Sequence, residues 1–423
     1  MKANDRPPTV HVIGAGLAGL SAAVTLAARG VRVEISEAAM QAGGRCRSYL
    51  DPVLDMTIDN GNHLVLTGNR ATFAYLKSIG AEDRLVGPKE ATFPFVDVAE
   101  GRRWTVRPNA GSLPWWLLDP SRRVPDAGLG DYLAIAALLP RRRDRRVDQV
   151  IACRGAVWER LIGPYLLAAL NTDPAIGSTE LAGAVIRETL AKGGRACLPR
   201  IASPSLSAAF IDPALAFLQA HGASVSFGQR LRALEASGGV VSALGLGDGR
   251  RPLAETDVVI LATPPWISAE LIPGLTVPDR FSPIVNGHFR IAPPAEASPM
   301  IGVIGGTAQW VFAFEDRLSV TVSGADDLVD DDRESLARRF WRDIAIVHGL
   351  PPELPPWQIV KERRATFAAT PEQNARRPGA RTAASNLFLA GDWTATGLPA
   401  TIEGAIQSGA KAADLVLKSH RAA

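Results

Sequence analysis

Residues 9–19, which read Thr-Val-His-Val-Ile-Gly-Ala-Gly-Leu-Ala-Gly, decide the fold of this chain. The first five form a short apolar run typical of a buried strand, and a G-x-G-x-x-G turn follows with glycines at positions 14, 16 and 19. Apolar residues at helical spacing predict a helix over Leu17–Arg29, with Gly30 placed to end it. A second strand, Val31–Ser36, ends in Glu37. The stretch therefore predicts a βαβ unit.

Such a unit is suited to binding a dinucleotide. Gly14 permits the tight turn, Gly16 lets the backbone approach a pyrophosphate, and Gly19 lets helix and strand pack closely. The helix N-terminus offers N–H groups and a positive dipole end to phosphates. Glu37 is placed to accept both ribose hydroxyls of an adenosine. A purely structural glycine turn is the alternative. We expect the whole turn to contact the cofactor: Gly14, Ala15, Gly16, Leu17, Ala18 and Gly19.

A second motif, Gly43-Gly44-Arg45, follows soon after Glu37. The glycines expose N–H groups, and the arginine supplies a forked cation for phosphate oxygens. The alternative is a surface turn with a solvated arginine. Together with the first turn, this segment resembles the glutathione-reductase-like flavoproteins, specifically the amine oxidase and phytoene desaturase superfamily. The resemblance implies that Gly43, Gly44 and Arg45 lie along the pyrophosphate of FAD.

A third motif near the C-terminus also resembles that superfamily. An apolar strand, Asn386–Ala390, leads into Gly391-Asp392-Trp393-Thr394, and a helix begins at Thr401-Ile402. The resemblance implies that Gly391 and Asp392 hold the ribityl and phosphate region. It also implies that the helix start stabilises negative charge on the reduced flavin. The alternative is an unrelated strand–loop–helix. No cysteine occurs in this motif, so we expect FAD to be bound non-covalently.

Motifs of one cofactor site at opposite ends of the chain predict a discontinuous FAD-binding domain. Strands are expected at Ala223–Phe227, Val240–Leu246 and Asp257–Ala262, and by the resemblance the backbone near Leu231 contacts adenine, with Ala262 also at the cofactor. The predicted fold class is α/β, a glutathione-reductase-like Rossmann domain with an interleaved α+β substrate domain. The FAD-binding domain is expected to comprise residues 1–80, 201–265 and 361–423, and the substrate domain residues 81–200 and 266–360.

The segment Asp59-Asn60-Gly61-Asn62-His63 is more distinctive. In related flavoproteins the corresponding stretch passes near the flavin ring, so Asn60 and Gly61 are expected to contact the cofactor. Its form resembles one branch, the squalene-associated FAD-dependent desaturases, regarded as hydroxysqualene dehydroxylases of bacterial hopanoid synthesis. The implied reaction is reductive: the hydroxyl leaves as water and reduced flavin delivers a hydride.

That reaction needs a proton donor at the leaving hydroxyl and an apolar surround that keeps water from a carbocation. Asp59 and His63 are the candidate catalytic residues by position. A turn cap or backbone anchor is the alternative for Asp59, and a hydrogen-bonded core histidine is the alternative for His63. Only one dinucleotide fingerprint is visible, so the electron donor or acceptor is expected to be a separate molecule.

Composition excludes several other classes. The formal charge is +3, from 46 basic and 43 acidic residues, which is too small for a general nucleic-acid binder. The three cysteines, Cys46, Cys153 and Cys197, form no CxxC pair, so neither a metal site nor a disulfide framework is expected. Hydrophobic residues make up 47% of the chain, as in an ordinary globular protein.

The charge is nevertheless uneven, because residues 100–146 hold ten arginines and five acidic residues. Residues 112–146 contain tryptophans and leucines followed by arginines, then leucines followed by arginines again, an order that suits a peripheral contact with anionic lipid. A helical cap over the substrate site is the alternative. No apolar run approaches the roughly 20 residues of a membrane-spanning helix. We expect a cytoplasmic protein that could lie at the inner face of the cytoplasmic membrane, where a lipophilic isoprenoid would enter.

Other functions stay open at this point. An oxidative isoprenoid desaturase of the phytoene type would run the hydride toward the flavin, and a flavin amine oxidase would usually place an aromatic pair around the amine. A prenyl-lipid escort protein would share the fold without redox chemistry. The joint presence of Glu37, Arg45 and Asp392 favours an enzyme that uses FAD.

Overall fold

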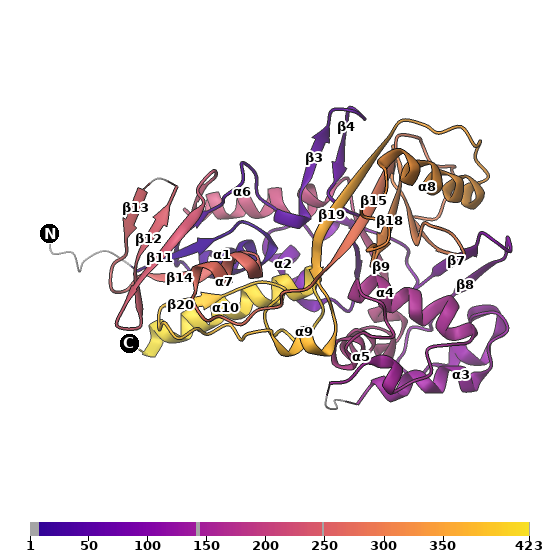
Figure 1. Ribbon diagram of the computed structural model, residues 1–423, viewed down its shortest axis with the longest axis horizontal. Coiled ribbons are helices and arrows are strands. Elements are labelled where there is room, and N and C mark those ends of the chain that lie inside the picture. Colours follow the sequence, from indigo (N-terminus) through magenta and orange to yellow (C-terminus); the bar gives the residue numbers. More distant parts are fainter. Residues whose placement is uncertain (1–7, 141–143, 248, 423) are drawn as a thin grey trace.

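The computed structural model describes residues 8–140, 144–247 and 249–422. Figure 1 shows an elongated molecule with a parallel sheet toward one end and a larger, mainly antiparallel sheet toward the other. Segments from the start, middle and end of the chain meet in the first sheet.

The first sheet has five parallel strands in the order β10-β2-β1-β14-β20. β1 lies at its centre and aligns Ile13 with Leu261 of β14 and Ser36 of β2, so three strands end at one edge. Parallel strands of this kind present their carboxyl ends to a ligand. The strands are β1 (Thr9–Ile13), β2 (Arg32–Ser36), β10 (Ser224–Ser226), β14 (Val258–Leu261) and β20 (Leu387–Leu389).

Two helices from opposite ends of the chain cover this sheet together. α1 (Leu17–Ala27) is almost wholly buried, and α10 (Ile402–Ala422) packs along it. A Cβ on Gly409 of α10 would lie 2.0 Å from the Ala18 carbonyl oxygen, so only glycine permits this close approach. α6 (Asp212–Ala220) also packs against α1.

The strands and the first helix expected at this end are confirmed, with ends that differ by one or two residues. The predicted strand Val240–Leu246 is β12, which lies between β11 (Leu231–Ser237) and β13 (Gly249–Pro252) in a separate three-stranded antiparallel sheet.

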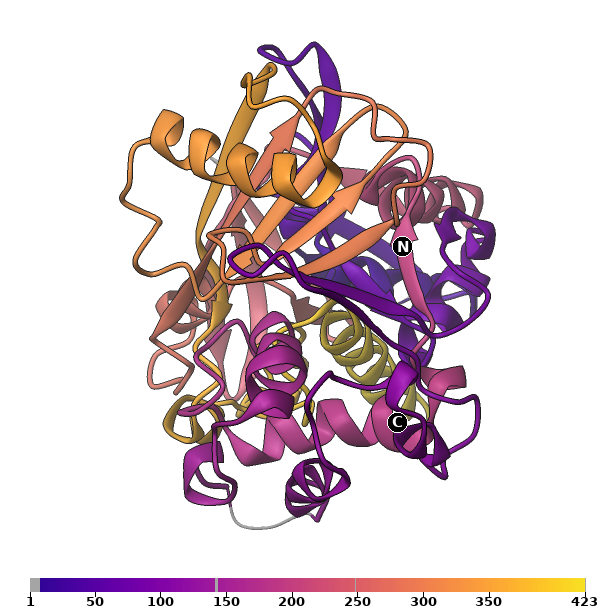
Figure 2. The same cartoon turned by 90° about the vertical axis from the view of Figure 1, so that its right-hand side faces the viewer.

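The second large sheet has seven strands in the order β19-β15-β18-β17-β16-β7-β8. α8 (Arg333–His348) covers one face through Leu336, Phe340 and Ile344, as Figure 2 shows in orange. Helices α4 (Gly163–Leu170) and α5 (Thr179–Glu188) join a core with the other face. The strands are β7 (Phe93–Asp97), β8 (Arg103–Val106), β15 (Phe281–Phe289), β16 (Met300–Ile304), β17 (Trp310–Ala313), β18 (Leu318–Ser323) and β19 (Trp357–Phe367).

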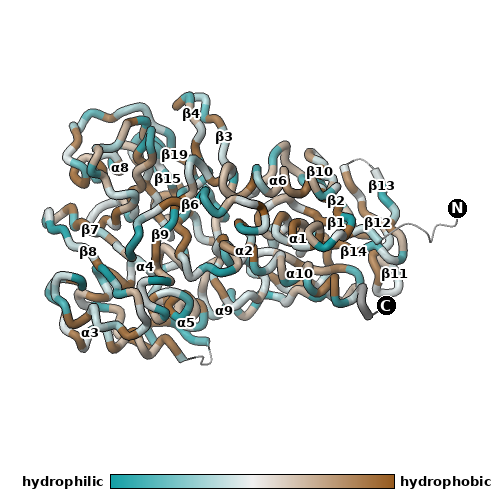
Figure 3. Tube along the Cα trace, turned by 180° about the vertical axis from the view of Figure 1, so that it is seen from behind, coloured by the Kyte–Doolittle hydropathy of each residue, from teal (hydrophilic) through white to brown (hydrophobic). Residues whose placement is uncertain are grey.

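The two ends are joined by continuous elements. The predicted domain boundary at residue 360 falls inside β19, which carries the chain from the seven-stranded sheet toward the parallel sheet. Apolar segments concentrate along β1, β14 and α5 in Figure 3. The remaining connecting elements are β3 (Ser48–Asp51), β4 (Met56–Asp59), β5 (Leu64–Leu66), α2 (Arg70–Ser78), β6 (Leu85–Val86), α3 (Leu129–Leu133), β9 (Pro199–Ala202), α7 (Pro265–Leu271) and α9 (Pro371–Ala375).

Within the described ranges, no helix combines the length and the apolar character needed to traverse a bilayer.

Candidate functional site

The glycine turn lies where β1 ends and α1 begins. Gly14 has φ +106°, and a Cβ there would lie 2.6 Å from the Ala262 carbonyl oxygen. A Cβ on Gly19 would lie 1.9 Å from the Gly14 carbonyl oxygen. By contrast, a Cβ on Gly16 would meet no atom within 4 Å, and no side chain caps α1. Packing therefore requires the outer glycines, while the middle one borders open space at an uncapped helix N-terminus.

Glu37 ties the second strand to this turn. Its carboxylate accepts hydrogen bonds from the Ala15 N–H at 2.7 Å and the Ala39 N–H at 2.8 Å. The Gln229 N–H donates to the Glu37 carbonyl at 2.8 Å, which brings the start of β11 beside Glu37. Leu231, two residues further on, is buried. The structure thus gathers the residues predicted for the adenosine end, and the roles of Glu37 and Leu231 stay predictions.

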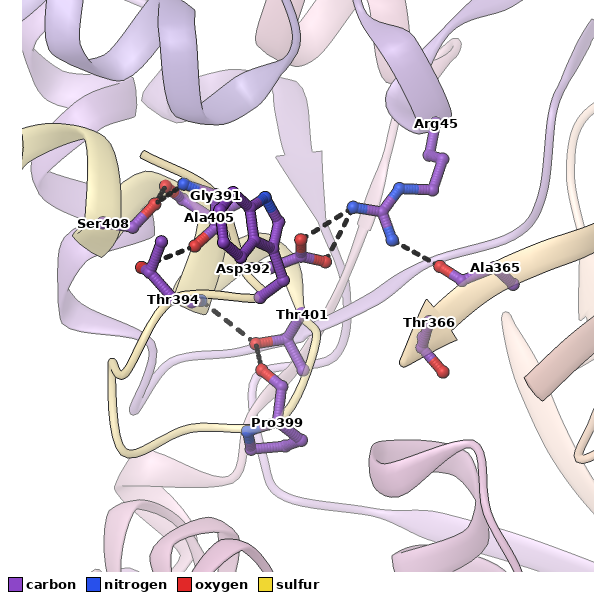
Figure 4. Close-up of polar contacts among 12 residues, drawn as sticks. Arg45, Ala365, Thr366, Gly391, Asp392, Thr394, Pro399, Thr401, Ala405 and Ser408 are labelled. Carbon is purple, nitrogen blue, oxygen red and sulfur yellow. Dashed lines mark hydrogen bonds and ion pairs between the residues drawn. The ribbon is translucent and has the colours of Figure 1, made fainter. Parts of the chain in front are cut away.

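The Gly-Gly-Arg segment packs on the same turn. The Gly43 N–H donates to the Ala15 carbonyl at 2.8 Å, and Gly43 and Gly44 have φ +108° and +55°, which suit glycine. Arg45 Nη2 then contacts both carboxylate oxygens of Asp392 at 2.8 Å, and Nη1 donates to the Ala365 carbonyl (Figure 4). Two motifs 347 residues apart in sequence are therefore joined by an ion pair.

The two side chains of the Arg45–Asp392 ion pair differ in their exposure to solvent. The Arg45 side chain is 45% exposed, whereas that of Asp392 is 8% exposed. Burial opposes the charge of Arg45, but the carboxylate of Asp392 outweighs it, so the pKa of Arg45 is raised. The guanidinium thus stays charged and keeps accessible surface beside the two glycines. The Arg45 side chain is therefore exposed but held by its ion pair, and its contact with a phosphate stays a prediction.

The C-terminal loop is held from several sides. The Gly391 N–H donates to Ser408 Oγ at 2.8 Å, and Thr401 Oγ1 accepts from the Gly404 N–H at 3.1 Å at the start of α10 (Figure 4). Trp393 is 2% exposed and donates to the Thr263 carbonyl, so it is a core residue of the loop. The Ala262 N–H donates to the Ile13 carbonyl, which joins the loop to the glycine turn.

Arg377 was not identified from the sequence, although it holds this loop. It is 7% exposed, and its Nη2 donates to the backbone carbonyls of Asp392 and Thr394 and to Thr396 Oγ1. Burial lowers the pKa of Arg377 to about 10. No motif marks this residue, because its function depends on a loop that only the fold brings to it.

His63 lies within the electrostatic reach of Arg45. Burial, and then the positive charge of Arg45, lowers the pKa of His63 to about 4. Its side chain remains partly exposed. At neutral pH the imidazole is therefore uncharged and carries one N–H donor. Such a group can orient a hydroxyl, but it is not a resting cationic acid.

Asp59 occupies a different environment. It is 2% exposed, and its Oδ1 accepts from Ser48 Oγ at 2.6 Å and from the Leu206 N–H at 2.9 Å. Its Oδ2 faces Arg317 Nη2 at 3.4 Å, and that side chain is 3% exposed. The carboxylate is enclosed by protein donors and has no accessible surface for a substrate. The structure therefore favours the anchoring alternative over the catalytic role predicted for Asp59.

The segment after Asp59 docks onto the seven-stranded sheet. The Asn60 carbonyl accepts from Asn286 Nδ2 at 3.4 Å, and Asn62 Nδ2 donates to Thr321 Oγ1 at 3.0 Å. A Cβ on Gly61 would lie 3.0 Å from Asn286 Nδ2, so a larger residue would require the Asn286 side chain to shift slightly. Asn60 and Gly61 are both buried, and their contact with a cofactor stays a prediction.

Cys46 is buried, and burial followed by the charge of Asp59 raises the pKa of its thiol. Among the described residues, no cluster of three histidine, cysteine or acidic side chains is placed to hold a metal ion.

Together these contacts fit a dinucleotide cofactor with a flavin end. The open space above Gly16 and the uncapped α1 suit a pyrophosphate. Arg45 adds an accessible cation on the same side. The start of α10 and the Asp392 loop lie next to that cation rather than in a remote part of the fold.

Comparison with known proteins agrees with this geometry. Residues 17–417 match the family model described as flavin containing amine oxidoreductase. The chain is 53% identical to a hydroxysqualene dehydroxylase of Sinorhizobium fredii over 97% of this chain and 99% of that protein. It is also 53% identical to a hydroxysqualene dehydroxylase of Rhodopseudomonas palustris, over 98% and 99% of the two chains.

Solved structures show the same fold at low identity. An oxidoreductase of Methanosarcina mazei superposes with a TM-score of 0.72 at 16% identity, covering 96% of this chain and all of that one. Cyclohexylamine oxidase of Brevibacterium oxydans superposes with a TM-score of 0.69 at 15% identity, covering 98% of this chain and all of that one. The chain therefore belongs to the family of flavin containing amine oxidoreductases, and within it to the branch of the hydroxysqualene dehydroxylases.

Proposed function

We propose that this chain is a hydroxysqualene dehydroxylase, which removes the hydroxyl of hydroxysqualene as water and places a hydride on the same carbon to give squalene. The observation that carries this proposal is the identity of 53% with proteins of that activity over nearly the whole chain. The site has the groups that such a reaction needs, namely residues that would hold a flavin, a nearby hydrogen-bond donor and apolar surroundings.

The cofactor of the proposal is FAD, bound without a covalent link. The glycine turn and Arg45 would hold its pyrophosphate, Glu37 its adenosine ribose, and Asp392 its ribityl region. Bound in its reduced form, FAD would supply the hydride that replaces the hydroxyl. A covalent link would need a nucleophile, and 391–402 contains no cysteine, while the raised pKa of Cys46 keeps that thiol protonated.

His63 is the proposed substrate contact. Its neutral imidazole would donate a hydrogen bond to the hydroxyl oxygen and hold the alcohol in one orientation. Since the pKa of His63 is lowered by burial and by Arg45, its proton becomes easier to retain when negative charge on the cofactor offsets Arg45. The proton needed by the leaving hydroxyl is proposed to pass through this group. Asp59 is proposed to anchor the 59–63 segment through its hydrogen bonds with Ser48 and Leu206 rather than to contact the substrate.

Apolar side chains in and next to the C-terminal loop that carries Asp392 would keep water from the reacting carbon. Trp393 and Phe367 are each 2% exposed and belong to one core cluster, which also contains Leu66 near His63. Water excluded from that region cannot capture a carbocation. A lipophilic isoprenoid is therefore the proposed substrate, and nucleic acid is not a proposed partner.

The reducing equivalents are proposed to come from a separate donor, because the chain has one dinucleotide fingerprint, at residues 14–19. The proposed location is the cytoplasm. The same flavin site in an oxidative desaturase would take electrons from the isoprenoid, so the direction of hydride transfer separates the two functions.

The test uses the purified protein with its own flavin. Acid precipitation should release FAD into the supernatant, as expected for non-covalent binding. The enzyme is then photoreduced without oxygen and mixed with hydroxysqualene, and the products are extracted and identified by mass spectrometry. We expect squalene and reoxidised flavin. Unchanged alcohol, or desaturation of squalene by the oxidised enzyme, would overturn the proposal.

A further inference from the structure

One stretch of the chain, residues 113–133, exposes several large apolar side chains. In the described residues, eleven large hydrophobic side chains are exposed, and five of them fall between positions 113 and 133. These five define the apolar ridge: Leu113 (79% exposed), Trp115 (55%), Leu118 (70%), Leu129 (46%) and Leu133 (73%). Single exposed leucines are ordinary, but such a concentration marks an interaction surface.

The ridge is a built feature rather than a loose loop. Four of its five residues lie in two short helical segments, Trp115–Leu118 and α3 (Leu129–Leu133), and Leu113 shortly precedes the first. Trp116 and Tyr132 are buried between the segments with their rings 5.7 Å apart, edge to face, and Tyr132 Oη accepts from the Val124 N–H at 2.9 Å. The inward residues of each segment thus fix the pair, and the alternate residues face outward. Figure 3 shows apolar stretches around α3 at the outer edge of the molecule.

Guanidinium groups border the ridge. Arg122 lies over the ring of Trp115, 5.0 Å from its centroid, and Arg123 donates to the Leu117 carbonyl at 3.1 Å. Arg107 is exposed, and its carbonyl accepts from Arg122 Nε at 3.0 Å. Arg102 and Arg160 pair with Asp126, whereas the described part of the chain gives Arg107, Arg122 and Arg123 no ion-pair partner. The Asp119 carboxylate lies within electrostatic range of Arg107 and Arg122. The three guanidinium groups outnumber that carboxylate, and beside exposed apolar side chains they complement an anionic, apolar surface.

We propose that the apolar ridge docks on the surface of an anionic lipid bilayer, with Trp115 at headgroup level and Arg107, Arg122 and Arg123 on lipid phosphates. Tryptophan and arginine favour that depth because each has an apolar body and a polar part. The reason for this docking rests on the proposed function, because a C30 alcohol partitions into the bilayer. The docking itself is a property of the ridge and does not depend on turnover.

The structure also shows which arginines lie beside the ridge. The sequence prediction covers residues 112–146, of which 141–143 lie outside the described residues. Arg146 pairs with Asp148, and the backbone carbonyl of Arg145 accepts from the Thr179 N–H. The cations that border the ridge are instead those at 107, 122 and 123.

Co-sedimentation with vesicles tests the proposal. The full-length, flavin-loaded protein is mixed with phosphatidylcholine vesicles that either contain or lack phosphatidylglycerol. The ridge variant carries Leu113→Ser, Trp115→Ser and Leu118→Ser. Its matched control carries Leu50→Ser and Val53→Ser on the β3–β4 hairpin, where the side chains are 67% and 66% exposed at the opposite edge of the molecule (Figure 1). All three side chains of the ridge variant are exposed, so its melting temperature should match that of the wild type.

We expect the wild type and the hairpin control to bind anionic vesicles alike, and the ridge variant to bind at least about tenfold more weakly. Raising the salt concentration should weaken wild-type binding, because exposed charges are screened. Equal binding by wild type and ridge variant, or no binding by wild type, would overturn the proposal. So would a dimer of the wild type that the ridge variant loses, since the ridge would then contact a second copy. Failure to form squalene would refute the proposed function and leave this result intact.

Discussion

Replacing Arg45 with methionine should weaken flavin binding strongly while leaving the fold intact. Methionine keeps an apolar stem of similar length but removes the contacts to both Asp392 oxygens and to the Ala365 carbonyl. It also leaves Asp392, 8% exposed, without its counterion beside the place expected for two phosphates. Both changes disfavour an anionic cofactor.

The magnitude follows from the contacts. A hydrogen bond to a charged group contributes about 1.5–3 kcal/mol. Because the Arg45 side chain is 45% exposed, solvent screening should keep its contribution to the free energy of FAD binding near the lower end of that range, at about 2 kcal/mol. That energy corresponds to a dissociation constant about 30-fold higher for FAD. Lysine at position 45 keeps the charge but loses the fork, so Arg45→Lys should fall between wild type and Arg45→Met.

The assay is a titration of flavin-stripped protein with FAD, followed by isothermal calorimetry. Arg363→Met is the matched control, because Arg363 lies on β19 near Ala365 and pairs with Asp330 at 2.7 Å, with side chains 63% and 81% exposed. Such a surface pair contributes little, so the control should bind FAD as the wild type does. If a folded Arg45→Met variant binds FAD within twofold of the wild type, Arg45 does not contact the FAD phosphates as proposed.

Three further outcomes are expected. Gly16→Ala should keep the melting temperature of the flavin-free protein, since its Cβ meets no atom within 4 Å, yet it should abolish FAD binding in the same titration; retained binding would contradict a pyrophosphate at this position. Arg317→Met should lower the free energy of unfolding in urea by about 3 kcal/mol, because Asp59 is left buried and unpaired, and adding Asp59→Asn should restore part of it. In flavin-free protein, NMR should show His63 titrating near pH 4, and Arg45→Met should raise that midpoint toward 6.5. Because this folded pKa lies below the unfolded value, the unfolded chain takes up the proton first as the pH falls. The free energy of unfolding should therefore be unaffected by His63 above pH 6.5 and should decrease as the pH falls from 6.5 toward 4. His63→Gln should remove that decrease.

The βαβ unit could be predicted because its signals are local. Gly14 is required by its positive φ angle and Gly19 by its close contact with the Gly14 carbonyl, and the second strand follows within a few residues of α1. The meeting of the two terminal motifs was implied only by family resemblance. Its physical form, an ion pair of Arg45 with Asp392, depends on parallel strands that align distant segments.

The roles of individual polar residues were harder to predict, because their partners are remote in sequence. Asp59 was a catalytic candidate by its position in a motif, but Leu206 and Arg317 enclose its carboxylate. Arg377 had no motif around it and still holds the loop that carries Asp392. The ridge residues were recognised by composition alone, and only the packing of Trp116 on Tyr132 shows which of them face outward.

In the proposed reaction, a hydride passes from the flavin to the carbon that carried the hydroxyl. A single anaerobic turnover of photoreduced enzyme with hydroxysqualene in deuterated water tests it most directly, because the transferable hydrogen of reduced flavin exchanges with solvent. We expect one squalene per flavin, each with a single deuterium at that carbon. Squalene without deuterium, or flavin that stays reduced while the alcohol is unchanged, would contradict it.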